Sequence, residues 1–169
     1  MLGVVMEMNQ PKRKQIRLEH YDYSQPGAYF ITVCTKDRAQ ILWTRPVGAD
    51  SIRPQDAPTL SHSGRIVETA IREIHSHYPN VFVDHFAVMP NHIHLLLRIE
   101  PEASGRMISA PTVPVIVGQL KRWVSRQVGR PIWQKSFYEH VIRNDASYLA
   151  IAEYIQTNPA RWDSDEYFA

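Results

Sequence analysis

The 169-residue sequence contains one cysteine and no long apolar run. One cysteine excludes an internal disulfide, and Cys34 lies in the apolar run YFITVCT, which favours a small buried side chain over a nucleophile. No stretch approaches the roughly 20 apolar residues of a membrane-spanning helix, and the first residues contain no apolar signal core. We therefore expect a soluble, cytoplasmic protein with no membrane partner.

The sequence also has little net charge, +2 with the histidines neutral, which by itself does not indicate a polyanionic partner. The distribution of charge is more informative, because basic residues form two clusters and acidic residues gather near the end in DSDEYF. Either basic cluster alone is typical of a solvated surface. The first cluster contains Lys12, Arg13, Lys14 and Arg17, and the second contains Lys121, Arg122, Arg126 and Arg130.

The pattern along the chain predicts a flexible basic arm over residues 1–20 and a single domain over residues 21–169. The order of elements is strand, helix, β-hairpin, helix, strand and helix, with a long proline-containing loop after the first strand. This order predicts a ferredoxin-like α+β fold, an antiparallel sheet with helices packed mainly on one face. The strands are expected at 25–35, 80–89, 92–100 and 137–143, and the helices at 65–78, 113–126 and 146–157.

Two histidines interrupt the apolar strand expected at 92–100. Side chains alternate along a strand, so His92 and His94 point to the same face, with Ile93 on the other. Two imidazoles about 7 Å apart along a strand can bind one divalent ion if another group supplies a further ligand. A lone pair of this kind equally suits two histidines that hydrogen-bond to carbonyls or face solvent.

The last expected helix carries a second pair of polar residues. Tyr154 and Asn158 are four residues apart, which places them one turn apart on a common helix face. The other face of this helix can pack on the sheet through Leu149, through Ile151 or Ala152, and through Ile155. Taken alone, the tyrosine fits an amphipathic core position and the asparagine before Pro159 fits a helix terminator.

Four motifs, in order, resemble the REP-associated tyrosine transposases, which are relatives of the single-tyrosine HUH transposases. The resemblance runs from about Arg17 to Trp162, nearly the whole chain. The motifs are YDYSQPGAYFITVCTKDR, VMPNHIHLLL, WQKSFYEHVIRN and AEYIQTNPARW.

The resemblance implies a metal-dependent endonuclease and strand transferase that acts on single-stranded DNA hairpins flanked by a guide tetranucleotide. By its pattern, His92, His94 and Asn158 hold Mg²⁺ or Mn²⁺, and Tyr154 forms a covalent 5′-phosphotyrosine. Tyr138 and Tyr148 are the competing nucleophiles. The family includes enzymes that act as monomers and as homodimers.

On this interpretation, basic side chains bind DNA phosphates, and Trp133 and Phe137 offer stacking surface, although Trp133 also fits the core. His140 matches a histidine of the family pattern and receives no role. A non-catalytic ferredoxin-like module that binds single-stranded nucleic acid is the main alternative, and a relaxase or replication initiator is a third. The expected DNA-binding residues are Arg13, Lys14, Arg17, Lys121, Arg122, Arg126 and Arg143.

Overall fold

The computed structural model describes residues 22, 25–44, 59–101 and 111–165. The basic arm expected over residues 1–20, with Arg13, Lys14 and Arg17, lies outside the described residues. The strands are β1 (Gly27–Cys34), β2 (Val81–Val88), β3 (His92–Ile99) and β4 (Tyr138–Ile142). The helices are α1 (His62–Arg72), α2 (Ile74–His77), α3 (Val113–Val128) and α4 (Asp145–Thr157), with the 3-10 helices η1 (Lys36–Arg38) and η2 (Asn158–Ser164).

The four strands form one sheet in the order β2-β3-β1-β4, and every neighbouring pair is antiparallel. A ferredoxin-like fold gives this order from two β-α-β units. The first strands of the two units, β1 and β3, lie side by side in the centre, and their second strands, β2 and β4, lie at the edges. The α+β fold expected from the sequence is therefore confirmed.

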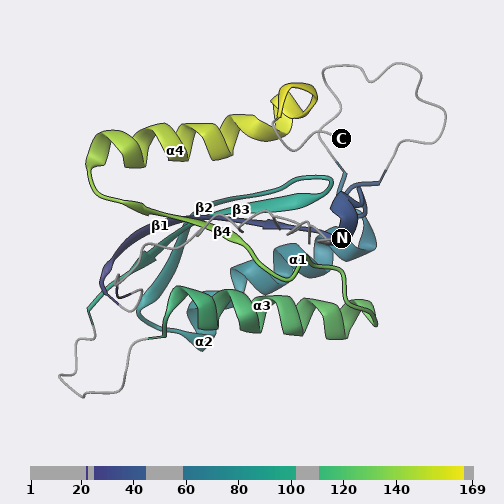
Figure 1. The fold of residues 1–169 in the computed structure, drawn as a ribbon, viewed down its shortest axis with the longest axis horizontal. Helices are drawn as coiled ribbons and strands as arrows, with labels where there is room; N and C mark the ends of the chain where they lie inside the picture. The colour runs from purple at the N-terminus through teal and green to yellow at the C-terminus, as the bar shows by residue number, and fades with distance from the viewer. Residues whose placement is uncertain (1–21, 23–24, 45–58, 102–110, 166–169) are drawn as a thin grey trace, which may run out of the picture.

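Helices lie on both faces of the sheet. In Figure 1, α1, α2 and α3 cover one face, and α4 crosses the other alone. The α1–α3 face carries the larger apolar core, to which β1 contributes Tyr29, Ile31 and Val33 and β3 contributes Ile93 and Leu95. Because side chains alternate along a strand, the residues between these point toward α4. Toward α4 there is a smaller apolar cluster that contains Leu96, Ala152 and Ile155.

Capping residues set the helix bounds near the site. The Asn144 side chain accepts a hydrogen bond from the Ser147 N–H (2.8 Å) and starts α4, which ends at Thr157 before Pro159, as expected. The first helix starts at His62, earlier than expected, because Ser61 caps it by accepting from the Gly64 N–H. It is also divided at Glu73 into α1 and α2.

Gly64 is required by a close approach of backbones. A Cβ atom at this position would lie 2.1 Å from the Leu42 carbonyl oxygen, which excludes any larger side chain without movement of the backbone. Within the described chain, residues 40–44 pair only through a bridge between Trp43 and Leu60, and residues 45–58 lie outside the described chain. In the described ranges, none of the helices has the length and apolar character of a membrane span.

Candidate active site at the start of strand β3

His92 and His94 are fully buried at the start of β3, beneath the C-terminal half of α4. Their Nε2 atoms lie 3.0 Å apart, so both imidazoles face the same point. Two ligand atoms that each bind one ion at about 2.1 Å are separated by roughly 3–4 Å. The pair therefore has the spacing of two ligands to a common cation.

Hydrogen bonds at Nδ1 orient both rings. The Nδ1 of His92 lies 2.8 Å from the Asn91 Oδ1, and the Nδ1 of His94 lies 2.9 Å from the Thr32 Oγ1. The amide oxygen of Asn91 only accepts, so His92 donates from Nδ1 and keeps a lone pair on Nε2. The Thr32 hydroxyl can accept or donate, so His94 can likewise present an Nε2 lone pair. This is the supporting arrangement that metal-binding histidines use.

Burial keeps both imidazoles neutral. Desolvation lowers the pKa of His92 to about 4, and this outweighs the opposing effect of the Asp165 carboxylate. Burial, and then the proximity of His92, also hold the pKa of His94 well below its usual value. Neutral imidazole is the form that binds metal ions, so the pair is in a metal-binding state at neutral pH.

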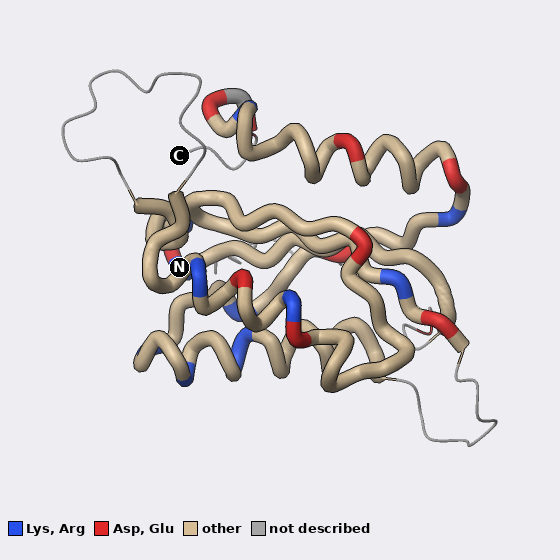
Figure 2. The backbone as a smooth tube through the Cα atoms, turned by 180° about the vertical axis from the view of Figure 1, so that it is seen from behind, with Lys and Arg blue, Asp and Glu red and all other residues tan. Residues whose placement is uncertain are grey.

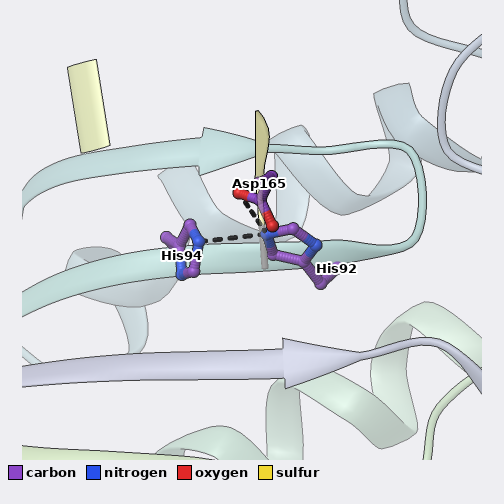
Figure 3. Close-up of side chains that lie close together, drawn as sticks. All are labelled: His92, His94 and Asp165. Carbon is purple, nitrogen blue, oxygen red and sulfur yellow. Dashed lines mark hydrogen bonds and ion pairs between the residues drawn. The ribbon is translucent and has the colours of Figure 1, made fainter. Parts of the chain in front are cut away.

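Asp165 is a site residue that the sequence reasoning missed. Helix η2 turns the chain back over the sheet, and the Asp165 Oδ2 lies 3.9 Å from the Nε2 of His92, with both side chains fully buried. Figure 3 shows the carboxylate directed at the His92 imidazole, with His94 beside it. The ligand atoms of these three residues all lie within 4.8 Å of one another. Two imidazoles and a carboxylate fit a divalent cation.

Tyr154 reaches the histidine pair from α4. Its hydroxyl oxygen lies 3.4 Å from the Nε2 of His94, and its ring stands edge-on to Phe30, which stacks on His94. The side chain is 37% exposed. The phenol oxygen is thus directed at the histidines while part of the ring remains open to solvent.

The competing tyrosines differ in their surroundings. The Tyr148 hydroxyl donates to the Asp84 carboxylate (2.8 Å), which also binds Arg98, and burial together with this hydrogen bond raises the pKa of Tyr148 to about 12. Tyr138 is exposed on β4 and contacts the edge of Phe30, with ring centroids 6.4 Å apart. Neither contact involves His92 or His94.

Asn158 is buried at the first position of η2, and its Nδ2 has no hydrogen-bond partner among the described residues. Its expected role as a metal ligand stays a prediction. Two packing expectations for α4 are confirmed, because Ala152 and Ile155 are buried, but that for Leu149 is wrong, because its side chain is 66% exposed.

Among the described residues, the expected DNA-binding side chains lie in two places, on α3 and just before α4. Arg122 and Arg126 are exposed on α3, on the face of the sheet opposite Tyr154, and Arg143 is exposed just before α4. The Lys121 ammonium donates to the carbonyl oxygens of residues 134–136, closest to that of Gln134 (2.6 Å). Their roles in binding DNA stay predictions.

The expected stacking residues are less accessible. Trp133 is buried in the α1–α3 core, where its surface cannot take a base, and Phe137 packs partly buried against the same core. His140 is exposed on β4.

Comparisons with known proteins add family evidence. No family model matches the chain. An uncharacterized protein of Haemophilus influenzae is 31% identical over 92% of this chain and 93% of its own length. A second protein of that organism, proposed to be a REP-associated tyrosine transposase, is 24% identical over 83% of this chain and 74% of its own length.

A solved structure supports the fold. The structure of a REP-associated tyrosine transposase bound to a REP hairpin matches with a TM-score of 0.59 and 23% identity, over 86% of this chain and 74% of that chain. The sheet order, the second relative and the four motifs agree. The chain belongs to the REP-associated tyrosine transposases.

Proposed function

We propose that the protein is a metal-dependent endonuclease and strand transferase that cleaves single-stranded DNA beside REP-like hairpins through Tyr154. One observation carries the proposal: the Tyr154 hydroxyl lies 3.4 Å from the Nε2 of His94, whose ring faces that of His92. On this proposal, the nucleophile and the cation site lie in the same chain, whether the protein acts as a monomer or as a homodimer.

In the proposed reaction, the Tyr154 oxygen attacks the scissile phosphorus. A P–Oη bond forms and the P–O3′ bond breaks, which gives a 5′-phosphotyrosine and a free 3′-hydroxyl, with the phenolic proton passing to solvent or to the leaving oxygen. The reverse attack by a 3′-hydroxyl joins a new strand and regenerates the phenol. The phosphodiester energy is conserved in the protein–DNA bond, so no nucleotide triphosphate is needed.

The cation is Mg²⁺ or Mn²⁺, held by His92 and His94 with Asn158 and Asp165 as the oxygen donors. When bound, it withdraws charge from the non-bridging phosphate oxygens as the transition state forms. Two neutral imidazoles and a carboxylate within 4.8 Å of one another support this assignment.

The substrate is a single strand because the tyrosine, the phosphorus and the leaving oxygen must lie in line, which a flexible backbone allows more readily than a stacked duplex. The hairpin beside the cleavage site supplies recognition, and the guide tetranucleotide fixes its position. Arg143 is exposed just before the first residue of α4, whereas Tyr154 lies near the end of this helix, so we expect Arg143 to contact the strand away from the scissile phosphate.

A covalent-adduct assay tests the proposal. Labelled single-stranded hairpin DNA is incubated with protein and Mg²⁺ or Mn²⁺, and the adduct is resolved on a denaturing gel. Tyr154→Phe should abolish the adduct. Tyr148→Phe is the matched control, because Tyr148 lies on the same helix but its hydroxyl donates to Asp84. This variant should still form the adduct.

Loss of the adduct in the Tyr148 or Tyr138 variant, with the Tyr154 variant active, would assign the nucleophile elsewhere. If the wild-type protein binds the hairpin but forms no adduct with either Mg²⁺ or Mn²⁺, the result would favour the non-catalytic binding module.

His92→Ala tests the metal site separately. The variant should lose most cleavage and lose the rise in melting temperature that Mn²⁺ causes in the wild-type protein, because one ligand is removed. Hairpin affinity should change little, since phosphate contacts elsewhere supply most of it. Equal Mn²⁺ stabilisation in the variant and wild type would contradict a metal site at the histidine pair.

A further inference from the structure

A cavity of about 290 Å³ opens between α1–α2 and α3. Its floor is apolar and includes Ile74, Ile116 and Leu120. It lies on the face of the sheet opposite α4, so it is separate from the histidine pair and Tyr154 (Figure 1). Ligand pockets in proteins start at about 300 Å³, which is the size class of a single nucleotide unit.

The charged residues that line the cavity are Arg122, Arg126 and Glu73, so the net charge around it is positive, which favours an anion. Every charged residue of α3 is basic, whereas the charged residues of α4 are Asp145 and Glu153 (Figure 2). Arg122 and Arg126 lie one turn apart on α3, are exposed, and line the cavity. Two guanidinium groups at this spacing can bind adjacent phosphate oxygens.

The remaining lining residues suit a nucleobase. The Tyr78 hydroxyl is buried and has no hydrogen-bond partner among the described residues, which is costly unless a ligand accepts a hydrogen bond from it. Trp123 is half-buried and lines the cavity, so its indole offers a stacking surface. Glu73 and Gln119 also line it and can pair with the polar edge of a base.

We propose that this cavity binds one unpaired nucleotide of the DNA, with the base against Trp123 and Tyr78 and its phosphates on Arg122 and Arg126. That this nucleotide is part of a DNA strand rests on the proposed function. Because Tyr154 acts on the other face, a strand that occupies both sites must pass around an edge of the sheet. The cavity would then select DNA by an unpaired position away from the cleavage site.

Binding measurements in a Tyr154→Phe background separate this proposal from catalysis. The probe is a fluorescently labelled hairpin with unpaired flanks, measured by fluorescence polarisation. Gln119→Trp should block the cavity from its exposed rim without altering the core, and the double variant Arg122→Gln, Arg126→Gln should remove the phosphate contacts. Arg130→Gln is the matched control, an exposed arginine of the same charge outside the cavity.

Both cavity variants should weaken binding about tenfold or more, and the double variant should lower the salt dependence of binding by about two phosphate contacts. The Arg130 variant should bind within about twofold of the background. Weakening in proportion to the positive charges removed, in both the double variant and the Arg130 variant, would reduce the effect to net charge and overturn the proposal. Unchanged binding in the Gln119→Trp variant would overturn it as well.

Photocrosslinking identifies the contact directly. Hairpins with 5-iododeoxyuridine at one unpaired position at a time should give a crosslink to Trp123 or Tyr78 from one position, and Gln119→Trp should remove it. Crosslinks confined to the α4 face would contradict the proposal. It would also be contradicted if the cavity bound free deoxynucleoside monophosphate but Gln119→Trp left DNA binding unchanged. Adduct formation through Tyr154 remains a separate readout, so failure of the cavity and failure of the proposed function are distinguishable.

Discussion

The two faces of the sheet use the same strands for different purposes. Toward α1–α3, β1 and β3 present only apolar side chains, including Tyr29, Ile31, Ile93 and Leu95, all fully buried. Toward α4 the same strands present Thr32, His92 and His94, also fully or almost fully buried. One face is a large continuous core, and the other combines a small apolar cluster with a polar site.

The difference shows how stability and chemistry are divided within one strand. The α1–α3 core is large enough to support a second face where polar groups are buried at a cost. The polar face is tolerable because its buried groups contact one another through the hydrogen bonds of Asn91, His92, His94 and Thr32. The comparison can be tested one residue at a time, since neighbours in a strand belong to different faces.

Leu95 and Leu96 are adjacent, fully buried leucines on opposite faces, and they should give the largest effects on stability. Leu95→Ala should lower the free energy of unfolding by about 3–5 kcal/mol, and Leu96→Ala by about 2–3 kcal/mol, because the smaller cluster can relax around the lost atoms. Urea denaturation measures both. A greater loss for Leu96→Ala would contradict the division between a main core and a smaller site-bearing face.

Acid should destabilise the metal-free protein through the polar face. The folded-state pKa values of His92 and His94 lie below the unfolded value of 6.5, so below pH 6.5 the unfolded chain binds protons that the folded chain does not. Stability should therefore be constant above pH 6.5 and fall by a few kcal/mol between about pH 6.5 and 4. Urea midpoints measured with a chelator present give this profile.

The matched variant for the pH profile is His94→Gln, which removes one buried imidazole. The stability of this variant should decrease less than that of the wild type between pH 6.5 and 4. An equally steep decline in this variant would assign the acid sensitivity to other groups.

Thr32→Val should give the smallest of these effects, because it replaces a polar residue of the α4 face with an aliphatic one of similar shape. The change removes the hydroxyl that orients His94 and should weaken Mn²⁺ binding about 10- to 100-fold. Electron paramagnetic resonance of free Mn²⁺ measures the affinity. Thr32→Ser keeps the hydroxyl and should bind nearly as the wild type does, whereas equal losses in both variants would indicate a packing effect.

The regular periods of the sequence predicted most of the fold and part of the site. The two-residue period of β3 places His92 and His94 on one face, which follows from local geometry. The assignment of Tyr154 to the same site came from the family resemblance, because its spacing alone fitted a core position. The ferredoxin-like fold also followed from the order of elements, because a hairpin and two helical crossovers leave few topologies.

Asp165 could not be predicted in the same way. It follows the seven-residue helix η2, which is divided by a non-helical residue at Arg161, so no fixed period relates it to Tyr154. In the sequence it belongs to the acidic run DSDEYF, which has the composition of a solvated end. Similarly, nothing in the pattern of α3 distinguishes Lys121, which binds backbone carbonyls, from Arg122 beside it.

The central claim is that α4 delivers the Tyr154 phenol to a cation site at the histidine pair. Mass spectrometry of the wild-type protein after reaction with hairpin DNA and Mn²⁺ tests it most directly, because peptide fragmentation locates the bound nucleotide. The account predicts a 5′-phosphodeoxynucleotide on Tyr154, absent when a chelator replaces the metal. The same modification on Tyr138 or Tyr148, or on Tyr154 at equal yield without metal, would contradict it.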